Sequence, residues 1–204
     1  MGVIPTLGPY LLPWLVPALN KYFPDLRLVI REDQTDSLMD RLLSHRLDAA
    51  LIALPFINDQ TESLALFDEP FWFAEPRKEI NAKADIMTVG ELQGQKLLLL
   101  TEGHCLRDQA LAICGAPAHD DEGDFRATSL ETIRQMVATG MGSTLLPALA
   151  CGNFEILGIT ARPLEVGIGR RIGLVWRRSY PRVKDLKLLA ETLAKHLPNG
   201  VHRI

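Results

Sequence analysis

Short apolar segments alternate with amphipathic segments along the chain, and this alternation constrains the fold more than any other feature of the sequence. Apolar runs typical of strands lie at 26–32, 49–54 and 96–100, and helical periodicity marks 35–45 and 128–139. Strands that alternate with helices in this way predict an α/β fold with mainly parallel sheets. Because the pattern occurs in both halves of the chain, we expect two similar, Rossmann-like α/β subdomains.

Proline and capping residues predict where individual helices bend, begin and end. In the first amphipathic segment, prolines recur at every fourth position from Pro5 to Pro17. Proline removes a helical hydrogen bond, so we expect this helix to be kinked or to begin late. Thr128 and Glu131 have the spacing of a capping box at the start of a later helix, and Gly140 predicts its end.

Threonines stand at several of the predicted strand-to-helix junctions. Thr6, Thr35 and Thr128 hold such positions, and so does the segment 101–104. In open α/β sheets, ligands bind beyond the carboxyl ends of the strands, where helices begin. These hydroxyl and backbone N–H groups therefore predict a small polar ligand. Threonine is also common at helix N-caps, so a purely structural role is equally compatible with each position.

Length, composition and charge are those of an ordinary globular protein. The chain has 204 residues, of which 47% are hydrophobic and 23% charged, and its formal net charge is −3. A chain with this slightly negative net charge has no basic surface of the kind that phosphate contacts require. We therefore expect no direct DNA binding by this chain. No apolar run is long enough to span a membrane, and no secretory signal is evident. We therefore expect no membrane contact and a cytoplasmic location.

The three cysteines are too few, and odd in number, for a secreted disulfide scaffold. A disulfide formed in a reducing compartment would be regulatory. The chain has no Cys-x-x-Cys motif, its five histidines lack the spacing of metal ligands, and no glycine-rich phosphate cradle is present. We expect neither a metal nor a cofactor.

Cys105 and Cys114 lie nine residues apart in a predicted short helix that Gly115 ends. Cys105 would stand at the helix start beside His104, where partial positive charge lowers a thiol pKa and speeds oxidation by peroxide. Nine helical residues separate the Cα atoms by about 13 Å, whereas a disulfide tolerates about 7 Å at most. A bond between the two cysteines would require this helix to unfold.

Two simpler interpretations of these residues stay open. Cys105 and Cys114 can both pack into a helix face without ever reacting, because cysteine is among the most often buried residue types. His104 can likewise be an ordinary residue at a helix start, with no part in chemistry.

Two stretches of the sequence resemble a known family. The run LTEGHCLRDQALAIC and the later FRATSLETIRQMVATGMGSTLLPALA are similar to the regulatory domain of the OxyR family of LysR-type, peroxide-sensing transcription activators. The segments IPTLGPYLLPWLVPALNKYFPDLRL and RRIGLVWR look like the same family, so the resemblance covers nearly the whole chain. GHCLRDQ followed by the second cysteine is typical of the peroxide sensors, whereas IPTLGPYLLP is shared more widely among LysR-type domains.

The resemblance implies a periplasmic-binding-protein-like fold, the LysR-type effector or regulatory domain, with two α/β subdomains joined by two crossing strands. Subdomain I would comprise 1–69 and 173–204, and subdomain II, with the redox cysteines, would comprise 70–172. The crossings would fall near 69–71 and 171–173. In this family an N-terminal winged helix-turn-helix domain precedes the regulatory domain, and we expect the present chain to be a fragment without it.

The resemblance also assigns roles to individual residues. Cys105 matches the peroxidatic cysteine and Cys114 the resolving one. The peroxide pocket of the family would correspond to Thr6, Thr35, Gly103 and His104. Arg170 matches an arginine that is associated with the reactive thiolate.

The resemblance further implies three partners: hydrogen peroxide, a second copy of the chain and, in the full-length protein, DNA. The homodimer would use the helix 7–23, residues near Ile30 and the helix 128–139, and the full-length protein would form a homotetramer that contacts DNA only through its N-terminal domain. The chain itself is not expected to be an enzyme.

Two other functions compete with peroxide sensing. A LysR-type domain can sense a small organic effector without any redox chemistry, and a thiol peroxidase would consume peroxide continuously. Cys151 lies outside the well-matched segments, and we expect it to behave as a small buried hydrophobic residue.

Overall fold

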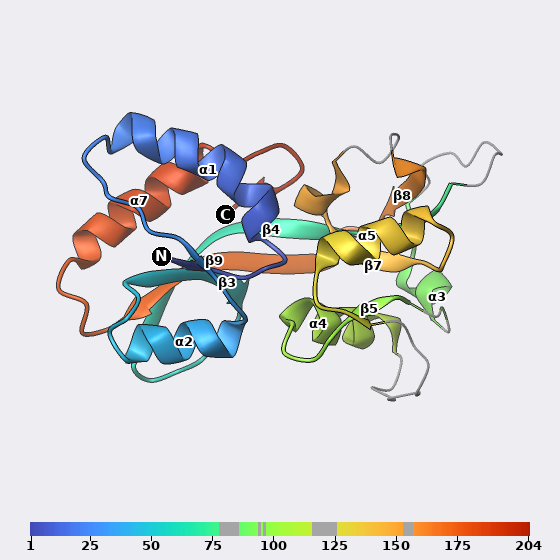
Figure 1. Cartoon of the computed structure of the whole chain (residues 1–204), viewed down its shortest axis with the longest axis horizontal. Helices are drawn as coiled ribbons and strands as arrows, with labels where there is room; N and C mark the ends of the chain where they lie inside the picture. The colour runs from blue at the N-terminus through green and yellow to red at the C-terminus, as the bar shows by residue number, and fades with distance from the viewer. Residues whose placement is uncertain (78–85, 94, 96, 116–125, 153–156) are drawn as a thin grey trace. The chain divides into compact units, whose positions relative to one another are not determined.

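A computed structural model describes residues 1–77, 86–93, 95, 97–115, 126–152 and 157–204 (Figure 1). The chain divides into two compact units: unit 1 comprises Met1–Glu69 and Arg170–Ile204, and unit 2 comprises Pro70–Gly169. The bounds that the resemblance implies are 1–69 with 173–204 for one subdomain and 70–172 for the other. The returning strand pairs with a strand of unit 1 at Arg171 and Ile172.

Unit 1 is built on a mixed sheet with the strand order β10-β4-β9-β3-β1-β2. β1 pairs in parallel with β2 and β3, whereas β9 is antiparallel to β3 and β10 is antiparallel to β4. The sequence predicts mainly parallel pairing, and the antiparallel pairs arise because β4 leaves unit 1 and β9 returns to it. The strands are β1 (Gly2–Val3), β2 (Arg31–Glu32), β3 (Ala49–Leu54), β4 (Thr61–Pro76), β9 (Gly169–Arg177) and β10 (His202–Arg203).

β3 has the bounds that the sequence predicts, but the strand expected at 26–32 is reduced to β2. The reason is the length of its neighbour: β1 has only two residues, so only Arg31 and Glu32 find parallel ladder partners in it.

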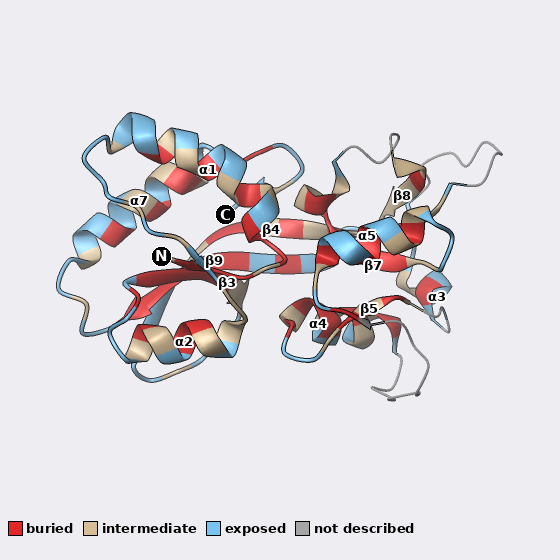
Figure 2. Cartoon of the chain, in the orientation of Figure 1, coloured by how far each residue is buried: buried red, intermediate tan, exposed pale blue. Residues whose placement is uncertain are grey.

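Three helices cover the sheet of unit 1: α1 (Gly8–Tyr22) and α7 (Val183–Lys195) lie side by side on one face, and α2 (Thr35–Leu43) lies on the other (Figure 1). Figure 2 shows that α1 has one buried and one exposed face. Leu11, Leu15 and Leu19 repeat every four residues on the buried face, while Pro13 and Pro17 are exposed. The helix therefore runs through both prolines and does not begin late.

Unit 2 contains two small sheets and three described α-helices. Within it, β4 pairs antiparallel with β7 (Thr144–Pro147) and β8 (Ile159–Pro163), and β5 (Leu99–Leu100) pairs in parallel with β6 (Arg126–Ala127). α4 packs on β5 and on α3, and α5 packs on β5 and β6. The remaining elements are α3 (Val89–Leu92), α4 (Cys105–Cys114), α5 (Leu130–Ala138) and the 3-10 helix η1 (Ala148–Cys151).

The start of α5 corrects one detail of the sequence analysis. Ser129, not Thr128, is the N-cap, and its hydroxyl accepts a hydrogen bond of 3.2 Å from the backbone N–H of Glu131. A capping box does occur in unit 2, at the start of α3, between Thr88 and Glu91. The serine at the next position thus fulfils the capping function that the sequence pattern assigned to the threonine.

The described helices and strands confirm the predicted α/β class. Lys96, at the start of the strand expected at 96–100, lies outside the described residues. Across the part of the chain that the structure describes, no helix is both long enough and apolar enough to cross a membrane.

Candidate functional site: a cysteine helix in unit 2 and a buried ion pair in unit 1

α4 begins at Cys105 and ends at Cys114, as the sequence predicts. β5 ends at Leu100, and a turn with Gly103 at φ +86° leads into the helix. A side chain at Gly103 would be strained in this left-handed conformation, so the turn favours glycine. At the other end Gly115 is in the left-handed conformation with φ +62°, which is the usual way to end a helix.

The two thiols of α4 are in different environments. Cys105 is half-buried at the helix N-terminus, where the helix dipole supplies partial positive charge. Cys114 exposes 3% of its surface, and this burial raises the pKa of its thiol. Cys105 is therefore the more accessible thiol, and Cys114 is held in its neutral form.

The helical geometry keeps these two cysteines apart. All three cysteines of the chain are thiols in this structure. Along α4 the Cα atoms of Cys105 and Cys114 are separated by about 13 Å, roughly twice the span of a disulfide. The two can bond only if the hydrogen bonds of α4 are broken first.

His104 precedes α4 at the N-cap position, although its side chain makes no capping hydrogen bond. It exposes 6% of its surface, and burial lowers the pKa of its imidazole. At neutral pH the ring is therefore uncharged and can offer one N–H donor next to Cys105. A neutral ring is a poorer proton donor than an imidazolium.

Arg170, Glu69 and Thr6 form a buried cluster in unit 1. The Arg170 Nε donates to Glu69 Oε2 at 2.8 Å, and neither side chain has solvent exposure. Arg170 Nη1 donates to the Thr6 hydroxyl oxygen at 2.7 Å, and Nη2 donates to the Thr6 carbonyl at 3.0 Å. One guanidinium thus joins β4, β9 and the turn that precedes α1.

An exposed ion pair lies one position away on the same two strands. Arg171 donates to the two carboxylate oxygens of Asp68 at 2.7 and 2.9 Å. These hydrogen bonds lower the pKa of Asp68. Both side chains are about half exposed, so of the two adjacent arginines only Arg170 is buried.

Neither of the two predicted threonine ligands is a helix N-cap. Leu7 caps α1, so Thr6 lies outside the helix, where it exposes 2% of its surface. Thr35 is the first residue of α2, whose N-cap is Gln34, and it is half-buried. The structural alternative of helix capping therefore does not explain these two threonines.

Glu69 is a site residue that the sequence analysis missed. It carries a signal nonetheless: Phe67, Glu69, Phe71 and Phe73 alternate along β4, and all four are buried. Because side chains alternate between the faces of a strand, a carboxylate in this series predicts a buried charge that needs a partner.

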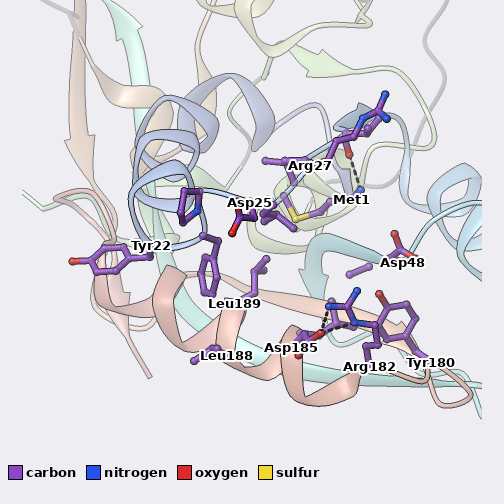
Figure 3. A pocket seen from close by; sticks show the side chains of 17 residues that line it. Met1, Tyr22, Asp25, Arg27, Asp48, Tyr180, Arg182, Asp185, Leu188 and Leu189 are labelled. Carbon is purple, nitrogen blue, oxygen red and sulfur yellow. Dashed lines mark hydrogen bonds and ion pairs between the residues drawn. The ribbon is translucent and has the colours of Figure 1, made fainter.

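A separate groove of about 770 Å³ lies in unit 1 between the segment that follows α1 and the start of α7 (Figure 3). Tyr22, Asp48 and Leu189 contribute to its walls, and Arg182 and Asp185 form an ion pair of 2.6 Å at its side. None of the predicted site residues lines this groove. Its position therefore does not support a part in the chemistry expected at Cys105.

Metal coordination has no support within the described ranges, because no three His, Cys, Asp or Glu side chains there are grouped closely enough to hold an ion. The predicted site residues offer thiols, hydroxyls and the buried guanidinium of Arg170 as their reactive or ligand-binding groups.

Comparison with known proteins points to one family. The model of the LysR substrate binding domain matches residues 1–198. The hydrogen peroxide-inducible genes activator of Pectobacterium carotovorum subsp. carotovorum is 41% identical over 199 residues, which cover 97% of this chain and 66% of that protein. The DNA-binding transcriptional dual regulator OxyR of Escherichia coli (strain K12) is 42% identical over 206 residues, which cover 100% and 68%. The chain thus spans about two thirds of the length of these relatives.

Solved structures agree with this assignment. A reduced form of OxyR from N. meningitidis has a TM-score of 0.90 and 31% identity, with 100% of this chain and 97% of that chain covered. A cysteine variant of Corynebacterium glutamicum OxyR bound to hydrogen peroxide has a TM-score of 0.85 and 32% identity, with 96% and 63% covered.

Proposed function

This chain belongs to the family of LysR substrate-binding domains, and we propose that it is the peroxide-sensing regulatory domain of a transcription regulator. One observation carries the proposal: α4 begins with a half-buried thiol at its N-terminus and ends with a second, buried thiol. The similarity to OxyR regulatory domains supports the same interpretation. We propose that Cys105 is the thiol that peroxide oxidises and that Cys114 resolves the product.

In the first step the Cys105 thiolate attacks one peroxide oxygen. The sulfur–oxygen bond forms as the oxygen–oxygen bond breaks, and the leaving hydroxide becomes water by taking up from solvent the proton that the thiol released on ionising. The product is a sulfenic acid on Cys105. The N-terminus of α4 favours the anionic form of the thiol, and the neutral ring of His104 can donate a hydrogen bond to a reacting oxygen.

In the second step the Cys114 sulfur attacks the sulfenic acid, a disulfide forms, and a second water leaves. Cys114 is buried and protonated in this structure, and about 13 Å of helix separates it from Cys105. The segment 105–114 must therefore leave its helical conformation before the bond forms. Such a segment is a two-state element that a covalent bond biases, and this converts a local oxidation into a conformational switch.

Thr6, Thr35, Gly103 and Arg170 complete the proposed set of residues that bind peroxide. Support for Thr6 comes from its hydrogen bonds: its oxygen accepts from Arg170, so its own proton remains to be donated to another oxygen. For Thr35 the support is its place at the first position of α2 without a capping role.

The full-length regulator is proposed to act in the cytoplasm as a homodimer or homotetramer, with DNA bound by another domain. The dimer would use α1, the region of Ile30 and α5. Exposed apolar side chains support part of this surface, since Trp14 on α1 and Val29 next to Ile30 expose 57% and 67% of their surfaces. Exposed aromatic and aliphatic groups of this kind are common in protein interfaces.

The test treats the reduced chain with one equivalent of hydrogen peroxide and compares non-reducing peptide maps with the intact mass. We expect a Cys105–Cys114 disulfide in the wild type and a trapped sulfenic acid on Cys105 in a Cys114→Ser variant. Oxidation spread evenly over the three cysteines, or none at all, would contradict peroxide sensing and favour an organic effector. Continuous peroxide consumption in the presence of a thiol reductant, far faster than with a small thiol, would instead indicate a peroxidase.

A further inference from the structure

His104 is buried at the start of the helix that has to unfold in the proposed reaction. It is the N-cap of α4, it exposes 6% of its surface, and its side chain makes no capping hydrogen bond. An imidazole in water has a pKa of about 6.5, and burial in unit 2 lowers the pKa of this one. The folded helix therefore keeps His104 uncharged at a pH where water would protonate it.

The described elements that pack against α4 bring no buried acid to His104. α4 packs on β5 and on α3. β5 consists of Leu99 and Leu100 and has no ionisable group. α3 has one, Glu91, which is exposed and accepts hydrogen bonds from Thr88. Neither element offers a buried carboxylate that would stabilise an imidazolium.

Four ionisable groups lie close to His104 along the chain: Glu102, Cys105, Arg107 and Asp108. Glu102 and Asp108 are exposed, so water screens their charges. Arg107 is a buried cation and does not favour a second positive charge. A thiolate on Cys105 would favour an imidazolium, but this charge disappears when the sulfur is oxidised. Oxidation thus removes the one half-buried anion in this set.

Disulfide formation also removes the helix that His104 caps. About 13 Å of helix separates the Cα atoms of Cys105 and Cys114, so residues 105–114 must leave the helical conformation before the two sulfurs can bond. An N-cap position exists only as long as its helix does. The surroundings of the imidazole therefore differ between the dithiol and the disulfide state.

We propose that His104 couples proton uptake to the thiol–disulfide switch: unfolding of α4 exposes the imidazole, which then binds a proton from solvent. This inference rests on the proposed function. As pH falls through about 6.5, the disulfide state takes up a proton at His104 that the helical dithiol state does not. Acidification therefore shifts the equilibrium toward the disulfide, and the switch responds to pH as well as to peroxide.

Exchange with glutathione makes this coupling measurable. The dithiol chain and oxidised glutathione give the disulfide chain and two molecules of reduced glutathione, so two electrons and two protons pass from the chain to glutathione. While all thiols are protonated, this exchange takes up no proton from solvent and its equilibrium constant does not depend on pH. Proton uptake at His104 adds a pH dependence to that constant.

The experiment measures the fraction of Cys105–Cys114 disulfide in glutathione buffers between pH 7.5 and 5.5, by acid quenching, alkylation and intact mass. For the wild type we expect the equilibrium constant to rise roughly three- to tenfold as pH falls, within the limit of about tenfold per pH unit for one proton. In His104→Gln this rise should be absent. Ionisation of Cys105 adds its own pH dependence, which is subtracted by using the thiol pKa of each variant, taken from its rates of alkylation by iodoacetamide.

Two further variants keep the test decisive. His104→Asn is also uncharged at every pH, and asparagine is favourable at an N-cap, so this variant guards against loss of α4. His196→Gln replaces an exposed histidine that follows α7 in unit 1, and it is the matched control that should keep the wild-type pH dependence. Cooperative urea unfolding checks that each variant is folded over the same pH range.

Two results would overturn the coupling. One is a wild-type pH dependence that persists in both His104 variants. The other is a wild-type equilibrium constant that, after the correction for Cys105, stays level or decreases as pH falls.

The two proposals fail in distinguishable ways. If the wild type forms no Cys105–Cys114 disulfide with peroxide or with glutathione at any pH, the proposed function fails and the role of His104 fails with it. If the disulfide forms but its pH dependence is the same in the wild type and in both His104 variants, only the role of His104 is lost.

Discussion

Two ion pairs join the same strands at neighbouring positions, and they have different surroundings. Glu69 and Arg170 are fully buried, whereas Asp68 and Arg171 are about half exposed. Both pairs have hydrogen bonds of similar length, at 2.8 Å and 2.7 Å. Water screens the exposed pair and can replace either partner, but nothing replaces a missing partner in the buried pair. The comparison teaches that burial, and not hydrogen-bond length, decides which pair the fold depends on.

The largest expected effect is on stability when the buried pair is broken. Glu69→Ala should lower the free energy of unfolding by roughly 3–5 kcal/mol, because it leaves the Arg170 charge buried without its carboxylate. Urea unfolding followed by circular dichroism measures the change. If the free energy of unfolding fell by less than about 1 kcal/mol, the Glu69–Arg170 pair would contribute no more than an exposed ion pair does. The contrast between the buried and the exposed pair would then be lost.

The next effect extends the comparison to the third member of the buried cluster. Thr6→Val removes the oxygen that accepts from Arg170 Nη1 and should cost about 1–3 kcal/mol, the penalty for an unsatisfied buried donor. It should also slow the oxidation of Cys105 by peroxide, as should Thr35→Val, with both variants still folded. Oxidation at the wild-type rate in folded Thr6→Val and Thr35→Val would exclude these threonines from the reaction.

A smaller effect concerns pH and a buried ionisable group in unit 2. Burial lowers the folded-state pKa of His104 below its ordinary value of 6.5. As pH falls through 6.5, the unfolded chain takes up a proton at this histidine that the folded chain does not. The free energy of unfolding therefore decreases as pH falls, with a slope that corresponds to the uptake of less than one proton. His104→Gln should have a shallower pH dependence between pH 7.5 and 5.5, measured by urea titration. Equal slopes would show that His104 titrates normally in the folded state.

The smallest effect belongs to the exposed pair. Asp68→Asn should leave the urea midpoint at neutral pH and high salt unchanged, because solvent screens the interaction with Arg171. The hydrogen bonds from Arg171 lower the folded-state pKa of Asp68, so this carboxylate contributes stability that is lost as pH falls through that pKa. The variant should therefore lose less stability on acidification than the wild type. A large loss for Asp68→Asn at neutral pH would make the two pairs equivalent.

Local sequence signals predicted much of the cysteine helix. The bounds of α4 and its end at Gly115 follow from periodicity and a left-handed glycine, which are interactions within a few residues. The separation of Cys105 from Cys114 follows from the same geometry. The strand expected at 26–32 was mostly wrong, because β strands depend on partners, and β1 pairs with only two of these residues.

For the predicted site residues, the sequence likewise marked single positions but not the contacts between distant ones. The sequence marked Thr6 and Arg170 separately, but their hydrogen bond joins positions 164 residues apart. Arg170 and Arg171 could not be ranked from the sequence, since adjacent strand residues point to opposite faces and only the packing around β9 decides which face is buried. Glu69 was overlooked because only the packing around β4 decides which face of that strand is buried. Its alternation with the phenylalanines of β4 was nevertheless visible in the sequence.

By itself, the sequence determined the α/β class, the cysteine helix with a thiol at each end, and the conflict between that helix and a disulfide. All three depend on the regular geometry of the backbone over a few residues. Only the tertiary structure decided that Arg170, and not Arg171, is buried, and that Glu69, 101 positions away, balances its charge. It also decided that Thr6 accepts hydrogen bonds from Arg170 and is not a helix cap. Strand pairing brings these residues together, and partners so distant in sequence leave no local pattern to read.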